Sequence, residues 1–70
     1  MREIIRNTVQ LLRDTKGVTQ AELADALGVT RQTIIALEKG NYTPSVLLAL
    51  KIAQYFRMPV EKIFTVYNEK

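Results

Sequence analysis

The sequence lacks both cysteine and histidine. Their absence excludes disulfides, thiolate and imidazole nucleophiles, and the usual zinc ligands. The main catalytic candidates that remain are carboxylates, and general acid–base catalysis needs such groups to converge. They are instead scattered along the sequence, at Asp14, Glu22, Asp25, Glu61 and Glu69. We therefore expect neither an enzyme nor a site for a metal ion or cofactor.

Long hydrophobic runs are also missing. The longest apolar stretch, Val46 to Leu50, is too short to span a bilayer, and no charged-then-apolar signal segment opens the chain. A cytoplasmic protein without membrane contact is the expectation. The sequence holds no separate ligand-binding region, so no small-molecule ligand is expected either.

The chain is short and basic. Its 70 residues are expected to form one domain, near the lower size at which a chain buries enough apolar surface to fold alone. A composition of 47% hydrophobic and 24% charged residues is typical of a globular protein. Ten basic residues outnumber seven acidic ones and the sequence pI is about 9.5, which suits a polyanionic partner.

Three glycines punctuate the first half of the chain, and each follows a segment with helical apolar spacing. A glycine just past a helix end readily takes the left-handed conformation that closes the helix. Gly17, Gly28 and Gly40 therefore predict three short helices. Asn7 is expected to cap the first helix, which runs to about Lys16.

The second and third helices begin with threonine caps. Thr19 and Glu22 have the spacing of a capping box, in which each side chain satisfies a free backbone amide of the other residue. Thr30 caps the third helix. The stretch 20–39 thus has the form helix, tight turn, helix, and Ala24 is small enough for the two helices to approach closely. We predict a helix-turn-helix here.

Two further helices are expected in the second half. Thr43-Pro44 should start the fourth, because proline fits the first helical turn, and Pro59 should open a short fifth. The inward face of the fourth helix is expected to include Val46, Ala49, Leu50, Ala53 and Phe56. Leu47 and Leu48 then widen the apolar stripe beyond what one core needs. The fold class predicted is an all-α, compact five-helix bundle.

Both ends of the chain look strand-like. Phe64-Thr65-Val66-Tyr67 alternates in polarity, and Glu3-Ile4-Ile5 is apolar enough to pair with it. The sequence therefore allows a small two-stranded β-sheet built from the termini.

The start of the third helix carries the functional signal. Arg31, Gln32 and Thr33 all form hydrogen bonds, at a place where a helix usually carries acidic residues to suit its dipole. Arginine can bind guanine O6 and N7, glutamine can do likewise for adenine, and a threonine methyl can contact thymine. Any small helical bundle can contain two helices joined through glycine, but that accounts poorly for these three side chains.

Several stretches of the sequence combine into a larger pattern. They are Arg13, Thr19-Gln20-Ala21-Glu22-Leu23-Ala24, Gly28-Val29-Thr30-Arg31-Gln32-Thr33-Ile34, Glu38-x-Gly40 and Pro44-Ser45. In residue type and spacing these stretches resemble the Cro/CI (XRE) family of helix-turn-helix transcriptional regulators, over Asn7 to Phe64. The resemblance implies a lambda-repressor-like fold and sequence-specific binding of double-stranded DNA.

The resemblance also implies roles for single residues. Arg13 and Glu38 match a mostly buried ion pair that ties the first helix to the recognition helix, so neither is expected to read bases. Residues matched to contacts with the DNA backbone are Thr19, Gln20, Lys39, Asn41 and Tyr42. Base reading is left to Arg31, Gln32 and Thr33, since Ile35 and Ala36 offer little hydrogen bonding.

Two residues depart from the family's pattern after Phe56. Arg57 stands where relatives usually have the glycine that ends the fourth helix, so either it accepts a left-handed conformation or the turn differs. Pro59 replaces the usual serine-like cap. Neither departure touches the recognition helix.

The three base-reading residues of one recognition helix make few contacts with DNA. Helix-turn-helix repressors typically form dimers that place two recognition helices about 34 Å apart. We therefore expect a homodimer, and the short cytolysin-repressor-like members that this chain resembles join their subunits through a terminal sheet. Candidate interface residues are Leu47, Leu48, Tyr55, Met58, Val66 and Tyr67. The leading prediction is a repressor bound to a palindromic operator. The alternatives are an antitoxin-type regulator that also binds a protein toxin, and a module that binds only proteins.

Overall fold

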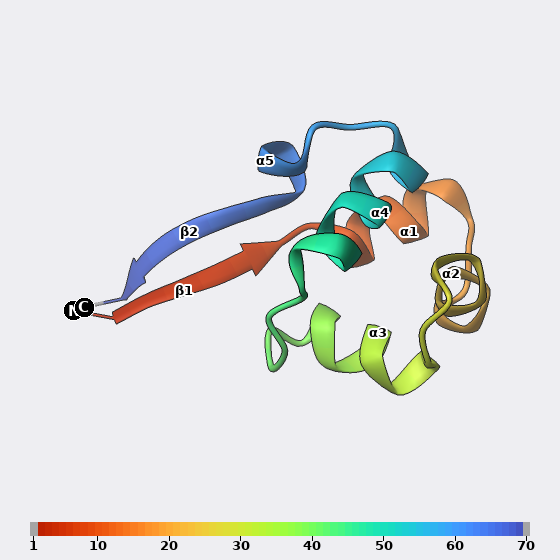
Figure 1. The fold of residues 1–70 in the computed structure, drawn as a ribbon, viewed down its shortest axis with the longest axis horizontal. Coiled ribbons are helices and arrows are strands. Elements are labelled where there is room, and N and C mark those ends of the chain that lie inside the picture. Colours follow the sequence, from red (N-terminus) through yellow and green to blue (C-terminus); the bar gives the residue numbers. More distant parts are fainter. Residues whose placement is uncertain (1, 70) are drawn as a thin grey trace.

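The computed structural model describes residues 2–69, which form five helices and two strands (Figure 1). The helices are α1 (Val9–Lys16), α2 (Gln20–Leu27), α3 (Arg31–Glu38), α4 (Val46–Phe56) and α5 (Val60–Ile63). The strands β1 (Arg2–Asn7) and β2 (Phe64–Glu69) lie at the two ends. The predicted five helices and the terminal sheet are therefore both present.

Local capping signals set most helix ends where they were expected. Gly17 and Gly28 close α1 and α2 in the left-handed conformation, at φ 75° and 73°. The Thr19 hydroxyl accepts a hydrogen bond from the Glu22 amide at 3.0 Å, and the Glu22 carboxylate accepts one from the Thr19 amide at 2.9 Å. Thr30 caps α3 by accepting from the Thr33 amide at 3.2 Å.

Two helix starts differ from the prediction. Strand β1 continues through Asn7, so Thr8 becomes the residue before α1, although its side chain makes no capping bond. The Asn7 Oδ1 still accepts a hydrogen bond from the Val9 amide at 3.1 Å, although Asn7 lies one residue before the N-cap position where it was expected. Helix α4 starts after Ser45, whose hydroxyl caps the helix by accepting a hydrogen bond from the Leu48 amide at 3.1 Å. Pro44 has no side-chain hydroxyl to cap a helix and lies outside α4.

The hydrophobic core draws one to three side chains from each helix. Side chains with no exposed surface come from α1, α2, α3, α4 and α5, and they are Val9, Leu23, Ile34, Leu37, Ile52 and Ile63. Each short helix thus buries one face against the others and leaves its opposite face to solvent.

The inward face of α4 is only partly the predicted one: Ala53 is buried and Phe56 packs against the core, as expected. Leu48 is only 5% exposed and lies in the core, so its assignment to a dimer interface is wrong. Val46 and Leu50, predicted to face inward, are 78% and 49% exposed. The buried face runs through Leu48 and Ile52, four residues apart. Because residues 46–50 are all apolar, their pattern alone does not fix the rotation of the helix.

The two strands form an antiparallel ribbon, here called the arm, which extends away from the helices (Figure 1). Its register pairs Arg2 with Glu69 at the tip and Asn7 with Phe64 at the base. An ion pair of 3.0 Å joins Arg2 and Glu69. The Arg6 guanidinium stacks 3.6 Å from the ring centre of Tyr67. The arm accounts for much of the 36 Å length of the molecule.

Arg57 resolves the first departure from the family's pattern. It takes the left-handed conformation at φ 55°, and its amide closes α4 on the Ala53 and Gln54 carbonyls. Apart from three glycines, it alone among residues 2–69 has a positive φ. Pro59, the second departure, stands at the N-cap of α5 with no side-chain cap.

Candidate nucleic-acid interface

Helices α2 and α3 form the helix-turn-helix. Ala24 is 3% exposed, and its carbonyl accepts from the Val29 amide at 3.0 Å, which folds the chain back after α2. Gly28 makes this turn with a positive φ that costs other residues energy. Ile34 and Leu37 point into the core, so the opposite side of α3 faces solvent.

The structure brings the three predicted base-reading residues together on the first turn of α3. Arg31 and Gln32 are exposed, and Thr33 is half-buried. The Thr33 hydroxyl lies 3.0 Å from that of Thr30, within hydrogen-bonding distance. Arg31 and Gln32 thus present their polar ends to solvent, while the Thr33 hydroxyl is already engaged within the helix start.

A buried ion pair ties α1 to the C-terminal end of α3. The Arg13 Nε donates to Glu38 Oε2 at 2.8 Å and its Nη2 donates to Oε1 at 3.2 Å, with side chains 11% and 4% exposed. Arg13 Nη1 also donates to the Val18 carbonyl at 2.9 Å. The hydrogen bond to Glu38 raises the pKa of Arg13, so the guanidinium stays charged. The pair therefore fixes α3 rather than facing DNA.

Gln20 takes part in the same network. Its amide Nε2 donates to Glu38 Oε1 at 3.0 Å, so one of its donors, expected to face a phosphate, is already used inside the protein. The Thr19 hydroxyl is likewise occupied by the capping box. The three other residues expected at the DNA backbone, Lys39, Asn41 and Tyr42, are exposed in the loop between α3 and α4.

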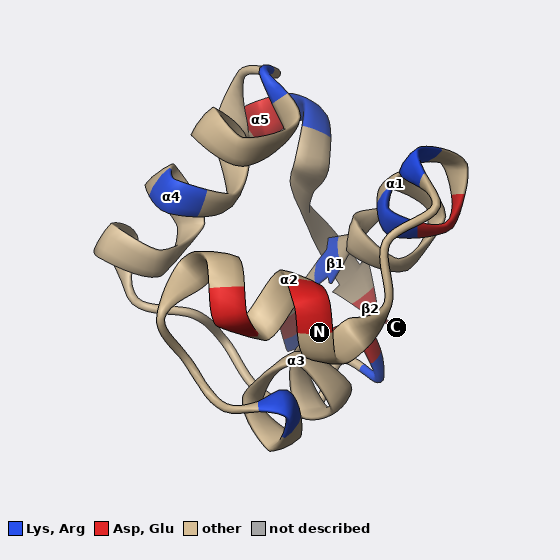
Figure 2. Cartoon of the chain, turned by 90° about the vertical axis from the view of Figure 1, so that its right-hand side faces the viewer, with Lys and Arg blue, Asp and Glu red and all other residues tan. Residues whose placement is uncertain are grey.

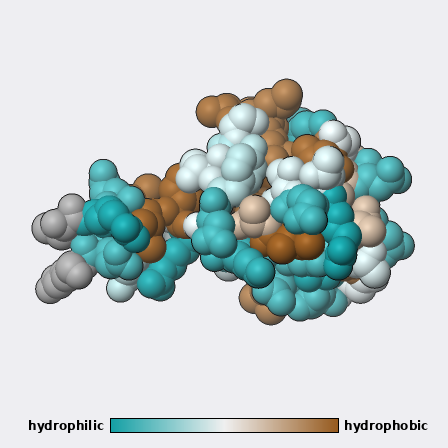
Figure 3. All heavy atoms as spheres, turned by 90° about the horizontal axis from the view of Figure 1, so that it is seen from below, coloured by the Kyte–Doolittle hydropathy of each residue, from teal (hydrophilic) through white to brown (hydrophobic). Residues whose placement is uncertain are grey.

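The surface chemistry differs between faces of the molecule. Viewed from the α3 side, the helical body is mostly hydrophilic with smaller hydrophobic patches between the polar residues, and further hydrophobic surface shows along the arm and at the upper edge (Figure 3). Acidic residues lie on α2 and a basic residue marks α3 (Figure 2). This separation leaves the start of α3 as the basic, hydrogen-bonding part of the helix-turn-helix.

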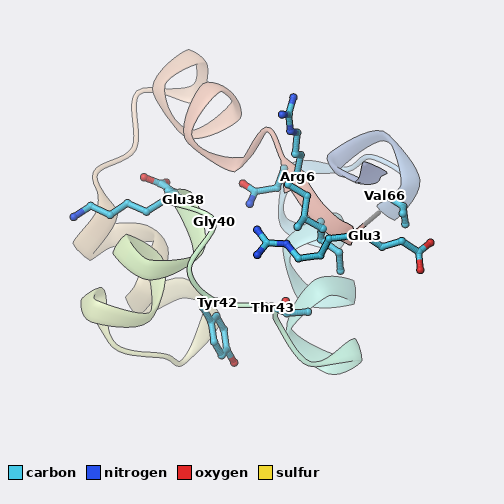
Figure 4. Close-up of a pocket in the computed structure, with 12 residues that line it drawn as sticks. Glu3, Arg6, Glu38, Gly40, Tyr42, Thr43 and Val66 are labelled. Atoms are coloured by element: carbon cyan, nitrogen blue, oxygen red, sulfur yellow. The ribbon is translucent and has the colours of Figure 1, made fainter. Parts of the chain in front are cut away.

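An open groove of about 720 Å³ separates the arm from the loop after α3. Figure 4 shows Glu38, Gly40, Tyr42 and Thr43 on one side and Glu3, Arg6 and Val66 on the other. One wall of the groove is therefore the loop expected at the DNA backbone, and the other wall is the arm. Among residues 2–69, no group of three or more carboxylates could hold a metal ion.

The residues predicted for a dimer interface fall into two groups, one exposed to solvent and one packed against the core. Leu47 is 68% exposed, Val66 is 66% exposed and Tyr67 is 42% exposed. Tyr55 and Met58 are half-buried and pack against the core. The residues that offer the most apolar surface are thus on α4 and on the arm.

Besides the bond from Gln20 to Glu38, two more long-range hydrogen bonds were not predicted from the sequence. The Lys51 ammonium donates to the Leu27 carbonyl at 2.6 Å, and the Asn7 Nδ2 donates to the Leu37 carbonyl at 3.0 Å. The available signal for Lys51 was its position as the single charged residue of α4, a mostly apolar helix. Asn7 showed no such signal, because its partner lies 30 residues away.

Comparison with known proteins identifies the family. The helix-turn-helix family model matches residues 9–63, and the chain is 48% identical over 65 residues to YgzD of Bacillus subtilis, an uncharacterized HTH-type transcriptional regulator. The match covers 93% of this chain and 98% of YgzD. The chain belongs to the Cro/CI (XRE) family of helix-turn-helix transcriptional regulators. It is therefore a DNA-binding regulator of a non-enzymatic family.

Two further similarities bear on the fold and on regulation. The restriction-modification controller protein C.AhdI of Aeromonas hydrophila superposes with a TM-score of 0.71 and 28% identity, over 77% of this chain and 82% of that one. It confirms the lambda-repressor-like fold. The transcriptional repressor RstR of the cryptic phage CTXphi in Vibrio cholerae is 31% identical over 52 residues, which cover 74% of this chain and 47% of RstR.

Within residues 2–69, no helix is long and apolar enough to cross a membrane.

Proposed function

We propose that this regulator is a repressor that binds a palindromic operator as a homodimer. The observation that carries the proposal is the first turn of α3, where Arg31 and Gln32 are exposed beside Thr33. Arg31 and Gln32 have the donors and acceptors needed to recognise purines in the major groove. The helix beneath them is fixed by its buried face and by the Arg13–Glu38 pair, so the reading side chains start from a rigid base.

The loop after α3 supplies contacts with the DNA backbone in this proposal. Lys39, Asn41 and Tyr42 are exposed there, and a lysine near a phosphate releases condensed counterions without reading sequence. Gln20 has a second amide N–H that can reach a phosphate while the first stays bonded to Glu38. Arg31, Gln32 and Thr33 then specify the sequence, and the loop positions the helix.

The homodimer is supported by exposed apolar surface. On α4, Val46, Leu47 and Leu50 are exposed, and on the arm Ile5 and Val66 form an exposed cross-strand pair. Such side chains on a small domain mark an interaction surface. Two copies related by a twofold axis would present two α3 helices to successive major grooves.

Repression is the regulatory outcome proposed. A dimer seated on a promoter prevents polymerase access by occupancy alone, which needs no further domain. The similarity to RstR, a transcriptional repressor, is consistent with this outcome.

The first experiment selects bound sequences from a random pool of duplex DNA at moderate salt. We expect enrichment of a palindrome, and enrichment of no sequence would refute the proposal. Arg31→Ala should then relax the preference at one base step per half-site and cost about 1 to 3 kcal/mol. Lys39→Ala should weaken all sequences alike and lower the salt slope by about one. Equal effects of the two variants would contradict the assigned roles.

The second experiment tests the dimer. Leu47→Glu should raise the dimer dissociation constant in sedimentation equilibrium, because it places a charge in an apolar contact. Leu11→Glu is a matched control, since Leu11 is 65% exposed on α1. A monomeric wild type, or equal effects of the two substitutions, would rule out a dimer through α4.

A further inference from the structure

Side chains from outside the helix-turn-helix bind the last residue of α2, at the turn that leads into α3, and the last turn of α3. At the end of α2, Lys51 of α4 donates to the Leu27 carbonyl. At the end of α3, Asn7 of β1 donates to the Leu37 carbonyl. These two bonds link residues 24 and 30 positions apart, so they depend on the whole fold.

The bond from Lys51 anchors the turn between α2 and α3. The turn's own amides satisfy the Ala24 and Asp25 carbonyls, whereas the Leu27 carbonyl receives the Lys51 ammonium at 2.6 Å. A Cβ built on Gly28 would lie 3.7 Å from the Lys51 Nζ, so the ammonium rests directly against the turn. A cation at this end of α2 also matches the negative end of the helix dipole.

The bonds from Asn7 join three elements. Its Nδ2 donates to the Leu37 carbonyl, which also accepts from the Gly40 amide at 3.1 Å. Its Oδ1 accepts from the Val9 amide at the start of α1. Because Asn7 is also the last residue of β1, one side chain connects the base of the arm, the start of α1 and the end of α3.

We propose that Lys51 and Asn7 are positioning residues that fix the orientation of α3, so that Arg31 and Gln32 meet the base edges. This inference rests on the proposed base-reading role of α3. Lys51 is adjacent to the exposed Leu50 on α4, and Asn7 lies two residues from the exposed Ile5 on the arm. The elements proposed for subunit contact, α4 and the arm, therefore also bind the turn before α3 and the end of α3.

The first test replaces Lys51 by methionine, which keeps the apolar stem and removes the ammonium. The matched control is Lys62→Met, which removes the same charge from an exposed position on α5. The measured quantity is the affinity for the selected operator divided by the affinity for random-sequence DNA, at fixed salt. We expect Lys51→Met to lower this ratio by about two- to tenfold, the range of one net hydrogen bond, and Lys51→Arg to restore most of it. The control should leave the ratio unchanged.

The second test replaces Asn7 by aspartate, which has nearly the same shape. The carboxylate still accepts from the Val9 amide but has no donor for the Leu37 carbonyl. Asn68→Asp adds the same charge at an exposed position on the arm and serves as the control. The ratio of operator to random-DNA affinity should fall about two- to tenfold in Asn7→Asp only. Ratios that match the controls in both tests would overturn the inference.

A measurement without DNA separates this inference from the proposed function. Backbone amide shifts and hydrogen exchange should change over residues 28–33 in Lys51→Met and over residues 36–40 in Asn7→Asp. Changes confined to α4 or to the arm would refute the positioning roles, even in a protein that binds its operator. Enrichment of no DNA sequence by the wild type would refute the proposed function, and the amide data would still decide the positioning roles. If Lys51→Met does not fold, Asn7→Asp carries the test alone.

Discussion

Removal of Arg13 should cost this protein a large part of its stability. The Glu38 carboxylate is 4% exposed and accepts three hydrogen bonds, two from Arg13 and one from Gln20. Arg13→Met leaves it with the Gln20 bond alone and also removes the donor to the Val18 carbonyl. Breaking a buried pair by removing one partner costs about 3 to 5 kcal/mol. A domain of this size has a total free energy of unfolding of about 4 to 10 kcal/mol.

The assay is urea unfolding followed by far-ultraviolet circular dichroism at pH 7. Arg13→Met should lower the free energy of unfolding by about 3 kcal/mol or more. The double variant Arg13→Met/Glu38→Leu should recover most of that loss, because an apolar pair of similar volume leaves no buried charge. A loss below about 1 kcal/mol in the single variant, as an exposed pair would give, would refute the reasoning. A double variant as unstable as the single one would refute it too.

Three further predictions concern the helix ends and the core. Leu48→Ala should lower the free energy of unfolding by about 2 to 5 kcal/mol, because it leaves a cavity in the core. Leu47→Ala should change the free energy of unfolding of the monomer by less than about 0.5 kcal/mol. Similar losses for the two variants in urea unfolding would contradict the placement of Leu48 in the core. Arg57→Gly should raise the free energy of unfolding by up to about 1 kcal/mol, because a left-handed conformation strains arginine more than glycine; a lower thermal midpoint would argue against strain at this residue. Hydrogen bonds from Thr19 lower the pKa of Glu22 from its ordinary value of 4.5, so its contribution should be complete above pH 4.5 and lost as the pH falls through the folded-state pKa. The difference in thermal midpoint between wild type and Glu22→Gln should therefore shrink from pH 7 to pH 3, and a constant difference would count against that coupling.

Features governed by local chemistry could be predicted from the sequence. Thr19 and Glu22 are three residues apart, and Gly28 follows directly after a helix, so their roles depend on few neighbours. The Arg13–Glu38 contact came from the resemblance to a family, since nothing local relates residues 25 positions apart.

Features set by packing could not be predicted in the same way. Residues 46–50 are apolar on every side, so only the final packing decides that Leu48 turns inward and Leu47 outward. Asn7 was expected at the helix cap, but pairing with Phe64 extends the strand over it. Lys51 and the Leu27 carbonyl meet only when α4 packs beside α2. Each of these outcomes depends on residues far away in the sequence.

The arm has a consequence for the order of events in folding. Its pairs join Arg2 to Glu69 and Asn7 to Phe64, the most distant partners among the described residues. Closing so long a loop costs more chain entropy than any contact between neighbouring helices, so the strands should pair after the helices have packed. Contacts absent from the folding transition state change the unfolding rate and leave the folding rate nearly unaltered. The arm should therefore form late in folding, so that its contacts mainly lower the unfolding rate and have little effect on the folding rate.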